Sequence, residues 1–156
     1  KVGPTHPGSG HATLRVEGCA DLFAVGDLAA PPAGAIGSGV ATTRMGCATA
    51  MPMGAHAADE IVRAMRGRRA EPYRFAYALR CISLGRRRGL VLALDQDDRP
   101  RGRYFSGAIG AMIKEVICRF VIGMMKLEAR VPGAYAWPRG RRPALLSEPT
   151  RPLLPR

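Results

Sequence analysis

Apolar positions follow a helical period between Thr49 and Gly67. There they recur every three or four residues, which predicts an amphipathic helix with Thr49 as its N-terminal cap and Gly67 at its C-terminal end. Pro52 falls in the first turn of this predicted helix, where its missing N–H costs nothing. Asp59 and Arg63 are four positions apart and are expected to form an ion pair. The pattern predicts one long helix in the first half of the chain.

A second helical pattern begins at Ser106 and continues to about residue 129. Its apolar residues share one broad face, and a narrow polar stripe with a Glu115–Arg119 pair lies opposite. The apolar face consists of Ile109, Met112, Ile113, Val116, Ile117, Phe120, Val121 and Met124. Charges interrupt the segment too often for a transmembrane span. We expect this helix to pack on its own domain or at a dimer interface, or else to lie on a membrane surface.

Strand-like runs occur on both sides of the first predicted helix. Residues 12–16 and 22–26 precede it, and the second run is continuously apolar, as in strands that are covered on both faces. The runs 75–85, 88–95 and 103–107 follow it and are separated by turns rich in Arg, Asp and Gly. Three strands at this spacing predict a small antiparallel sheet.

Changes in composition divide the chain into three parts. We expect an α/β element in residues 1–69, the small sheet with its helix in 70–130, and an irregular basic tail in 131–156. The predicted fold class is therefore α/β. Because only part of an α/β domain is expected, followed by a small antiparallel sheet with its helix, the chain itself is an α+β fragment. The chain has 156 residues and begins with Lys1, and we expect that it was cut out of a longer protein.

The formal net charge of +12 is concentrated in residues 61–94, which hold nine basic residues and one acidic residue. A basic surface can attract nucleic acid or anionic lipid, but no zinc finger, homeodomain or aromatic-glycine RNA-binding motif occurs, so no nucleic acid partner is expected. The four cysteines form no C-x-x-C pair, and no metal site is predicted. Cys81 lies in a predicted strand and is interpreted as a buried, inert thiol rather than a redox centre.

Asp27 is a candidate ligand-binding residue because it follows the run 22–26, where a strand is expected to end. Ligands of open α/β sheets bind outside the carboxyl ends of the strands. Gly26 permits close backbone approach, and the Asp27 carboxylate can accept hydrogen bonds from ligand hydroxyls. The start of the helix near Thr49 adds free N–H groups that attract an anion or a polarised carbonyl. Spacing alone favours the other interpretation, a structural role in which Asp27 caps a turn.

Three motifs together resemble a known family. They are DLFAVGDLAA at 21–30, RMGCATAMPMGAHAADEI at 44–61 and LRCISLGRRRGLV at 79–91. Their order resembles that of the two-dinucleotide-fold, FAD-dependent pyridine nucleotide oxidoreductases, specifically the NADH dehydrogenase-like (type II) branch, over residues 12–130. The resemblance implies that residues 1–69 hold the last strand and helix of an FAD domain, and that a hydride passes from NAD(P)H to FAD.

The resemblance also implies roles for four residues. Asp27 would hold the ribityl hydroxyls of FAD, and Gly26 would give access. The backbone at Cys47 and Ala48 would face the pyrimidine edge of the isoalloxazine ring, where its N–H groups and the helix dipole stabilise negative charge on the reduced flavin. No catalytic side chain is identified.

Two departures from the family pattern limit what the resemblance implies. Quinone-reducing members carry glutamines where this chain has Pro52 and Met53. We therefore expect a small-molecule electron acceptor, and the sequence gives little support for a quinone in that role. No G-x-G-x-x-G motif occurs, so the chain resembles the C-terminal third of such an enzyme and is expected to bind FAD weakly or not at all when alone.

Related enzymes attach to membranes through a C-terminal amphipathic region. The resemblance therefore implies a cytoplasmic protein that can contact the inner face of the cell membrane peripherally, with a homo-oligomer as a further option. The alternative function is a non-catalytic, basic and amphipathic module that docks on a membrane or a partner.

Overall fold

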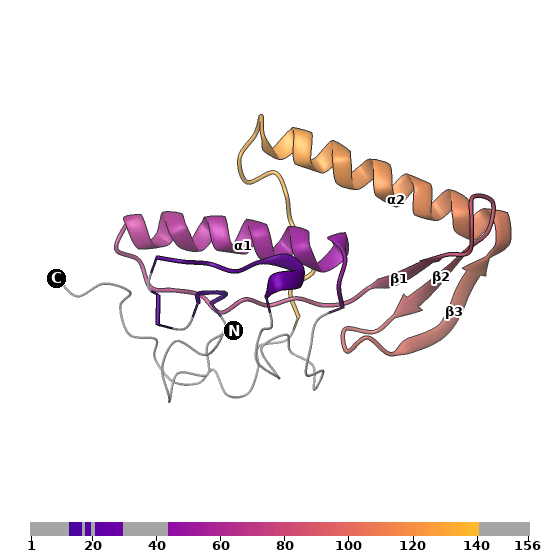
Figure 1. The fold of residues 1–156 in the computed structure, drawn as a ribbon, viewed down its shortest axis with the longest axis horizontal. Helices are drawn as coiled ribbons and strands as arrows, with labels where there is room; N and C mark the ends of the chain where they lie inside the picture. Colours follow the sequence, from indigo (N-terminus) through magenta and orange to yellow (C-terminus); the bar gives the residue numbers. More distant parts are fainter. Residues whose placement is uncertain (1–12, 17, 20, 30–43, 141–156) are drawn as a thin grey trace. The chain divides into compact units, whose positions relative to one another are not determined.

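The computed structural model describes residues 13–16, 18–19, 21–29 and 44–140 (Figure 1). These residues divide into two compact units. One unit holds the residues up to Phe75 together with Arg139 and Gly140, and the other is Ala76–Pro138. The predicted tail beyond residue 140 lies outside the described residues. The prediction of a mixed α/β fold with a small antiparallel sheet is confirmed.

The first unit begins with two extended segments that pair with each other. Arg15 and Phe23 form one antiparallel bridge, and the Val16 N–H donates to the Leu22 carbonyl at 2.8 Å. The Arg15 guanidinium also lies 4.8 Å from the centre of the Phe23 ring. The prediction of a strand over 22–26 that is covered on both faces is wrong for this structure. Leu22 is 54% exposed. Within the described residues, the segment is joined to only one neighbouring segment, through the single bridge between Arg15 and Phe23, so no sheet covers it.

Helix α1 spans Cys47–Met65 and begins three residues earlier than predicted. Its N-cap is Gly46, so the prediction that Thr49 caps the helix is wrong. The Thr49 hydroxyl instead lies within donating distance of the carbonyl oxygens of Arg44 at 2.7 Å and Gly46 at 2.9 Å. Because α1 starts early, Pro52 lies inside the helix rather than in its first turn.

The C-terminal end of α1 is the one that the sequence predicts. Gly67 has a φ of +62°, in the left-handed region that glycine adopts without strain. Its N–H donates to the Ala64 carbonyl at 3.0 Å, and the Arg68 N–H donates to the Arg63 carbonyl at 2.9 Å. These two bonds form a Schellman motif, which satisfies carbonyl groups that the end of a helix leaves free.

The second unit contains the small sheet, with strands β1 (Leu79–Ser83), β2 (Gly89–Leu94) and β3 (Pro100–Ser106). The strands are antiparallel in the order β1-β2-β3, with β2 in the centre (Figure 1). Val91 and Leu94 of β2 are buried, while every residue of β3 is exposed. The half-buried thiol of Cys81 lies opposite Val91 in this register.

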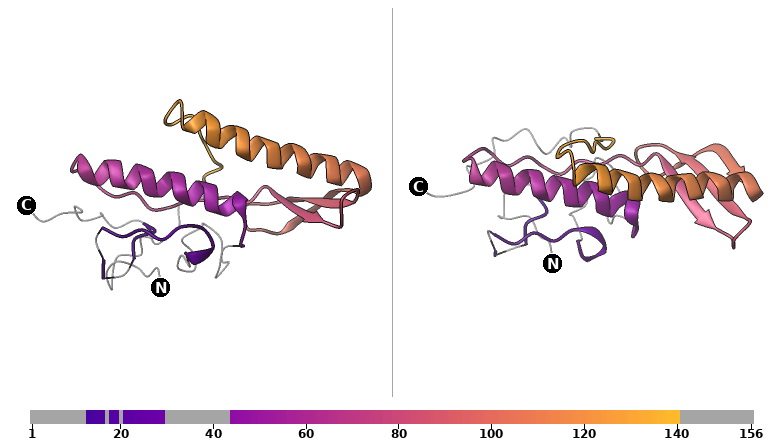
Figure 2. Two further views of the ribbon diagram at one scale, coloured as in Figure 1. Left: turned by 45° about the horizontal axis from the view of Figure 1, so that its top comes forward. Right: turned by 90° about the horizontal axis from the view of Figure 1, so that it is seen from above.

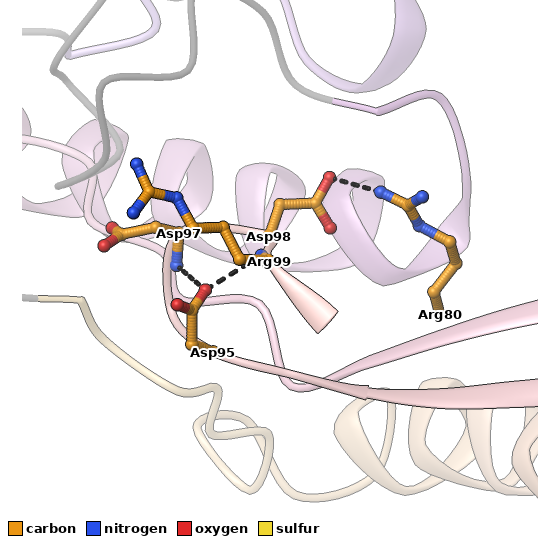
Figure 3. Close-up of polar contacts among 5 residues, drawn as sticks. All are labelled: Arg80, Asp95, Asp97, Asp98 and Arg99. Carbon is orange, nitrogen blue, oxygen red and sulfur yellow. Dashed lines mark hydrogen bonds and ion pairs between the residues drawn. The ribbon is translucent and has the colours of Figure 1, made fainter. Parts of the chain in front are cut away.

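Aspartates organise the turn between β2 and β3 (Figure 3). Asp95 Oδ1 accepts hydrogen bonds from the backbone N–H groups of Asp97 and Arg99, each at 2.9 Å. Asp98 has a φ of +64° and pairs with Arg80 of β1, with 2.8 Å between Arg80 Nη2 and Asp98 Oδ2. The turn is therefore fixed from within by Asp95 and tied to the far strand of the sheet by Asp98.

Helix α2 spans Gly107–Glu128 and runs along the sheet (Figures 1 and 2). Ser106, where the helical pattern is predicted to begin, is its N-cap. Two glycines allow the close approach. A Cβ added to Gly89 would lie 2.8 Å from the Ala111 backbone nitrogen, and one added to Gly110 would overlap the Gly89 carbonyl. At the other end of α2, Glu128 accepts hydrogen bonds from the N–H groups of Gly133 and Tyr135.

The apolar face predicted for this helix is divided in two by the structure. Ile113, Ile117, Val121 and Met124 are half-buried, whereas Ile109, Met112, Val116 and Phe120 are more than half exposed. The predicted pair between Glu115 and Arg119 is confirmed at 2.9 Å.

Candidate functional site

The candidate site is built around Asp27, which lies in the short 3-10 helix η1 (Gly26–Leu28). Asp27 Oδ1 accepts a hydrogen bond from the Gly46 N–H at 3.2 Å. Gly46 is the N-cap of α1, so this bond connects the Gly26–Asp27 pair to the start of a helix that follows 19 residues later in the chain. The structure thus brings together two of the predicted motifs at the positive end of a helix dipole.

Gly26 and Gly46 give this connection its backbone geometry. Gly26 has a φ of +67°, and a Cβ added to it would lie 3.4 Å from the Cβ of Ala50 in the first turns of α1. Gly46 has a φ of +149°. Both values lie where residues with a Cβ are rarely found. Gly46 was missed as a site residue in the sequence, although a glycine directly before a helical period is a recognisable helix-start signal.

Cys47 and Ala48 are the first two residues of α1, and both are exposed. The N–H groups of Thr49 and Ala50 donate to the Gly46 carbonyl at 3.2 and 3.0 Å. Those of Cys47 and Ala48 have no hydrogen-bond partner among the described residues. All four predicted site residues therefore lie at one end of α1, where the two free donors point out of the helix start.

The Asp27 carboxylate retains capacity to accept further hydrogen bonds. Its side chain is exposed, and Oδ2 accepts no hydrogen bond from the described residues. A carboxylate that only capped the helix would use the same bond to Gly46, so that bond alone does not distinguish a structural from a binding role. What the arrangement offers chemically is an acceptor for hydroxyls beside two donors for a carbonyl or an anion.

Two residues early in α1 face the protein interior. Pro52 and Met53 are both fully buried on α1. Neither side chain has a polar group, and neither reaches the surface on which Cys47 and Ala48 lie exposed. The helix therefore presents no side-chain amide to a ligand at these positions.

A buried polar cluster lies further along the same helix. His56 packs on Tyr73 with 5.5 Å between the ring centres, and its Nε2 has no hydrogen-bond partner among the residues that the structure describes. Burial lowers the pKa of His56 from 6.5 to about 4; the positive charges of Arg139 and Arg63 act in the same direction, and Glu71 opposes them. His56 is therefore a core residue of the first unit, and its low pKa favours the neutral imidazole at pH 7.

Glu60 is the fully buried carboxylate of this cluster. Its Oε1 accepts a hydrogen bond from the Glu71 N–H at 3.0 Å and lies 3.5 Å from Nε of Arg63. Desolvation raises the pKa of Glu60, although the Glu71 N–H and Arg63 oppose the shift. Arg63 also pairs with Glu71 at 3.1 Å. The predicted pair between Asp59 and Arg63 is therefore wrong, because Arg63 turns toward the segment that returns under the helix.

The chain matches no known protein-family model, and no curated protein sequence matches it. Neither α1 nor α2, the helices of the described part of the chain, is long and apolar enough to cross a lipid bilayer. Within the same residues, no three His, Cys, Asp or Glu side chains lie close enough together to hold a metal ion.

Proposed function

We propose that the chain is the C-terminal part of an FAD-dependent NAD(P)H oxidoreductase, and that Asp27 and the start of α1 bind the flavin. The observation that carries this proposal is that one end of α1 places the exposed carboxylate of Asp27 beside the N–H groups of Cys47 and Ala48, which have no hydrogen-bond partner among the described residues. The hydrogen bond from the Gly46 N–H to Asp27 Oδ1, at 3.2 Å, holds the carboxylate there. The resemblance of the motifs to NADH dehydrogenase-like enzymes supports the choice of ligand.

The residues of the site fit the chemical groups of FAD. A ribityl chain offers hydroxyl donors, which suit the Asp27 Oδ2 atom, an acceptor that no described residue uses. The pyrimidine edge of the ring offers a carbonyl, which suits the N–H groups of Cys47 and Ala48. Bound FAD would supply the capacity to accept a hydride from NAD(P)H and to pass electrons to a second molecule.

The chain's own contribution would be orientation and electrostatics. The positive end of the α1 dipole, together with the free N–H groups, favours negative charge close to Cys47 and Ala48. Asp27 is held in place by Gly46 and would fix one end of the ligand. Since Pro52 and Met53 are buried and apolar, we propose that the electron acceptor is a small molecule that needs no amide contact at these positions.

Flavin content tests this proposal. The protein should be purified with its upstream coding sequence, and also as the 156-residue chain alone, and the absorption spectrum of each recorded. We expect a flavin spectrum for the longer protein and little or no flavin with the chain alone. A longer protein without flavin would contradict the proposal, and tight stoichiometric binding by the chain alone would contradict the need for further segments.

The alternative function is a non-catalytic docking module, and one observation favours it. Ile109, Met112, Val116 and Phe120 of α2 are apolar and more than half exposed. The β1–β2 turn, directly before Gly89, which bridges Gly107 at the start of α2, carries the exposed residues Arg86, Arg87 and Arg88. Such a module needs no carboxylate at the start of α1. If flavin binding is absent, and Asp27→Ala changes no binding property of the protein, the docking module is the better description.

A further inference from the structure

The outward side of α2 carries one continuous line of residues without charge. We call this line the outer stripe; it consists of Ile109, Met112, Val116, Phe120, Gly123 and Leu127. Its five side chains are between 43% and 62% exposed. The inward residues of the same helix are half-buried instead, so the outer stripe is a second apolar surface that the described residues leave uncovered.

The spacing of the outer stripe keeps it straight along the helix. Successive members are three, four, four, three and four residues apart, which is an 11-residue repeat. That repeat corresponds to about 3.67 residues per turn, close to the 3.6 of a straight α-helix. The stripe therefore faces one direction over the whole length of α2 and suits a straight partner helix.

The outer stripe is complementary to itself when a second copy runs antiparallel to it. Phe120 protrudes from the stripe and is 59% exposed, whereas a Cβ added to Gly123 would meet nothing within 4 Å. If two copies of α2 are related by a two-fold axis between residues 121 and 122, Phe120 of each copy lies opposite Gly123 of the other. The same axis places Val116 of each copy opposite Leu127 of the other, so one register matches both pairs.

Charges beside the outer stripe favour the same register. Glu115 and Lys126 lie on the same flank of the stripe, and both are exposed. In an antiparallel pair with this axis, a flank meets the same flank of the other copy, and Glu115 comes within about 3 Å, along the helix axis, of the level of Lys126. Arg119 pairs with Glu115 at 2.9 Å within the helix. It therefore extends the contact between Glu115 and Lys126 of the other copy into a network of alternating charge.

We propose that the outer stripe of α2 is the interface for a second copy of this chain, with the two helices antiparallel and Phe120 seated over Gly123 of the other copy. A second copy fits because one register matches the protruding Phe120 with the gap at Gly123 and also brings Glu115 close to Lys126. A lipid surface would require none of these three features. The proposal does not depend on flavin binding.

The first test is the mass of the 156-residue chain by analytical ultracentrifugation over a range of concentrations. We expect a reversible dimer of twice the chain mass of 16.7 kDa. Phe120→Ala should weaken dimerisation by roughly tenfold or more, as the loss of a central aromatic contact usually does. Ile122→Ala is the matched control, because Ile122 is 56% exposed on α2 but lies off the outer stripe, and it should leave the dimer unchanged.

Gly123→Leu separates this interface from simple apolar adhesion. The substitution fills the gap that Phe120 needs and should weaken the dimer, while it raises helix propensity and so should not unfold the chain. Thermal unfolding of the variant checks that the fold is kept. Binding of the same variant to vesicles of phosphatidylcholine and phosphatidylglycerol tests the alternative that the outer stripe contacts lipid. In that case the added leucine should increase the affinity for the vesicles.

Charge exchange tests the register. Glu115→Lys and Lys126→Glu should each weaken the dimer roughly fivefold, and the double variant should restore it. A chain that is monomeric at all concentrations would overturn the proposal, as would a dimer that is indifferent to Phe120→Ala and Gly123→Leu. Single charge variants that are not rescued by the double variant would overturn the antiparallel register, and a monomer whose vesicle binding increases in Gly123→Leu would identify the outer stripe as a lipid contact instead.

Discussion

Asp27 and Gly46 are joined by a hydrogen bond of 3.2 Å from the Gly46 N–H to Asp27 Oδ1. This bond fixes a carboxylate at the positive end of α1, next to the exposed residues Cys47 and Ala48. Its two partners come from separate sequence motifs, so neither motif on its own describes the site. The proposed flavin site depends on this relationship more than on any other contact in the first unit.

The titration of His56 gives a prediction for stability at acid pH. The pKa of His56 is lowered from 6.5 to about 4 in the folded protein, so between these values the unfolded chain binds more protons. The free energy of unfolding should therefore fall as the pH drops through this window, by on the order of 3 kcal/mol. His56→Phe keeps a ring against Tyr73 and should flatten the profile measured by urea unfolding. An unchanged slope between pH 4 and 6.5 in the variant would contradict the assignment.

Glu60 should act in the opposite direction. Its pKa is raised above 4.5 by burial, so in the window above that value the folded protein binds more protons than the unfolded chain. The stability that this carboxyl contributes is complete below its ordinary pKa and is lost as the pH rises through the raised value. Glu60→Gln should be less sensitive than the wild type to this rise. Asp59→Asn, at the exposed neighbouring position, should show the same dependence of stability on pH as the wild type. If Glu60→Gln also shows the wild-type dependence, burial does not raise the pKa of Glu60.

Two glycines of α2 give a matched pair of predictions. Gly110→Ala places a methyl group against the Gly89 carbonyl and should destabilise the second unit by about 1–3 kcal/mol, as overpacking usually does. Gly123→Ala adds the same group where nothing lies within 4 Å, and should stabilise the helix by roughly 0.5–1 kcal/mol. Thermal unfolding of both variants measures the difference. Equal effects would show that α2 does not approach the sheet at Gly89.

The turn between β2 and β3 depends on one oxygen atom. Asp95 Oδ1 accepts hydrogen bonds from the N–H groups of Asp97 and Arg99, so Asp95→Ala should lower the free energy of unfolding by about 1–2 kcal/mol. Asp97→Ala is the control, because the Asp97 N–H is part of the turn but its carboxylate makes no hydrogen bond or ion pair within the described residues. Chemical denaturation of both variants tests this. A larger loss for Asp97→Ala would contradict the role of Asp95.

The sequence predicts much of the second unit because its signals are local. Short strand-like runs, turns rich in Arg, Asp and Gly, and the helical period after Ser106 each specify their own element. The same pattern could not separate the two halves of the apolar face of α2, because Phe120 and Val121 are equally apolar. Which of them meets the sheet depends on the tertiary contact between Gly89 and Gly110.

In the first unit, the sequence predicts which residues form the candidate site but not how the structure holds them together. Asp27, Gly26, Cys47 and Ala48 were all identified from motifs, and the structure brings them to one end of α1. Gly46 was missed, because a hydrogen bond across 19 residues leaves no periodic signal. The continuous apolar run at 22–26 suggested a covered strand, yet coverage depends on neighbours that local pattern cannot supply.

The most direct test of the central claim is the affinity for FAD of the protein carrying this chain with its upstream sequence, compared with that of its Asp27→Ala, Asp27→Asn and Asp21→Ala variants. Asp21 is an exposed aspartate of the same segment and serves as the control. We predict that Asp27→Ala lowers the affinity roughly tenfold or more, that Asp27→Asn lowers it less because the amide keeps an acceptor for the Gly46 N–H, and that Asp21→Ala has no effect. Wild-type affinity for FAD in a folded Asp27→Ala variant would contradict the proposed flavin site.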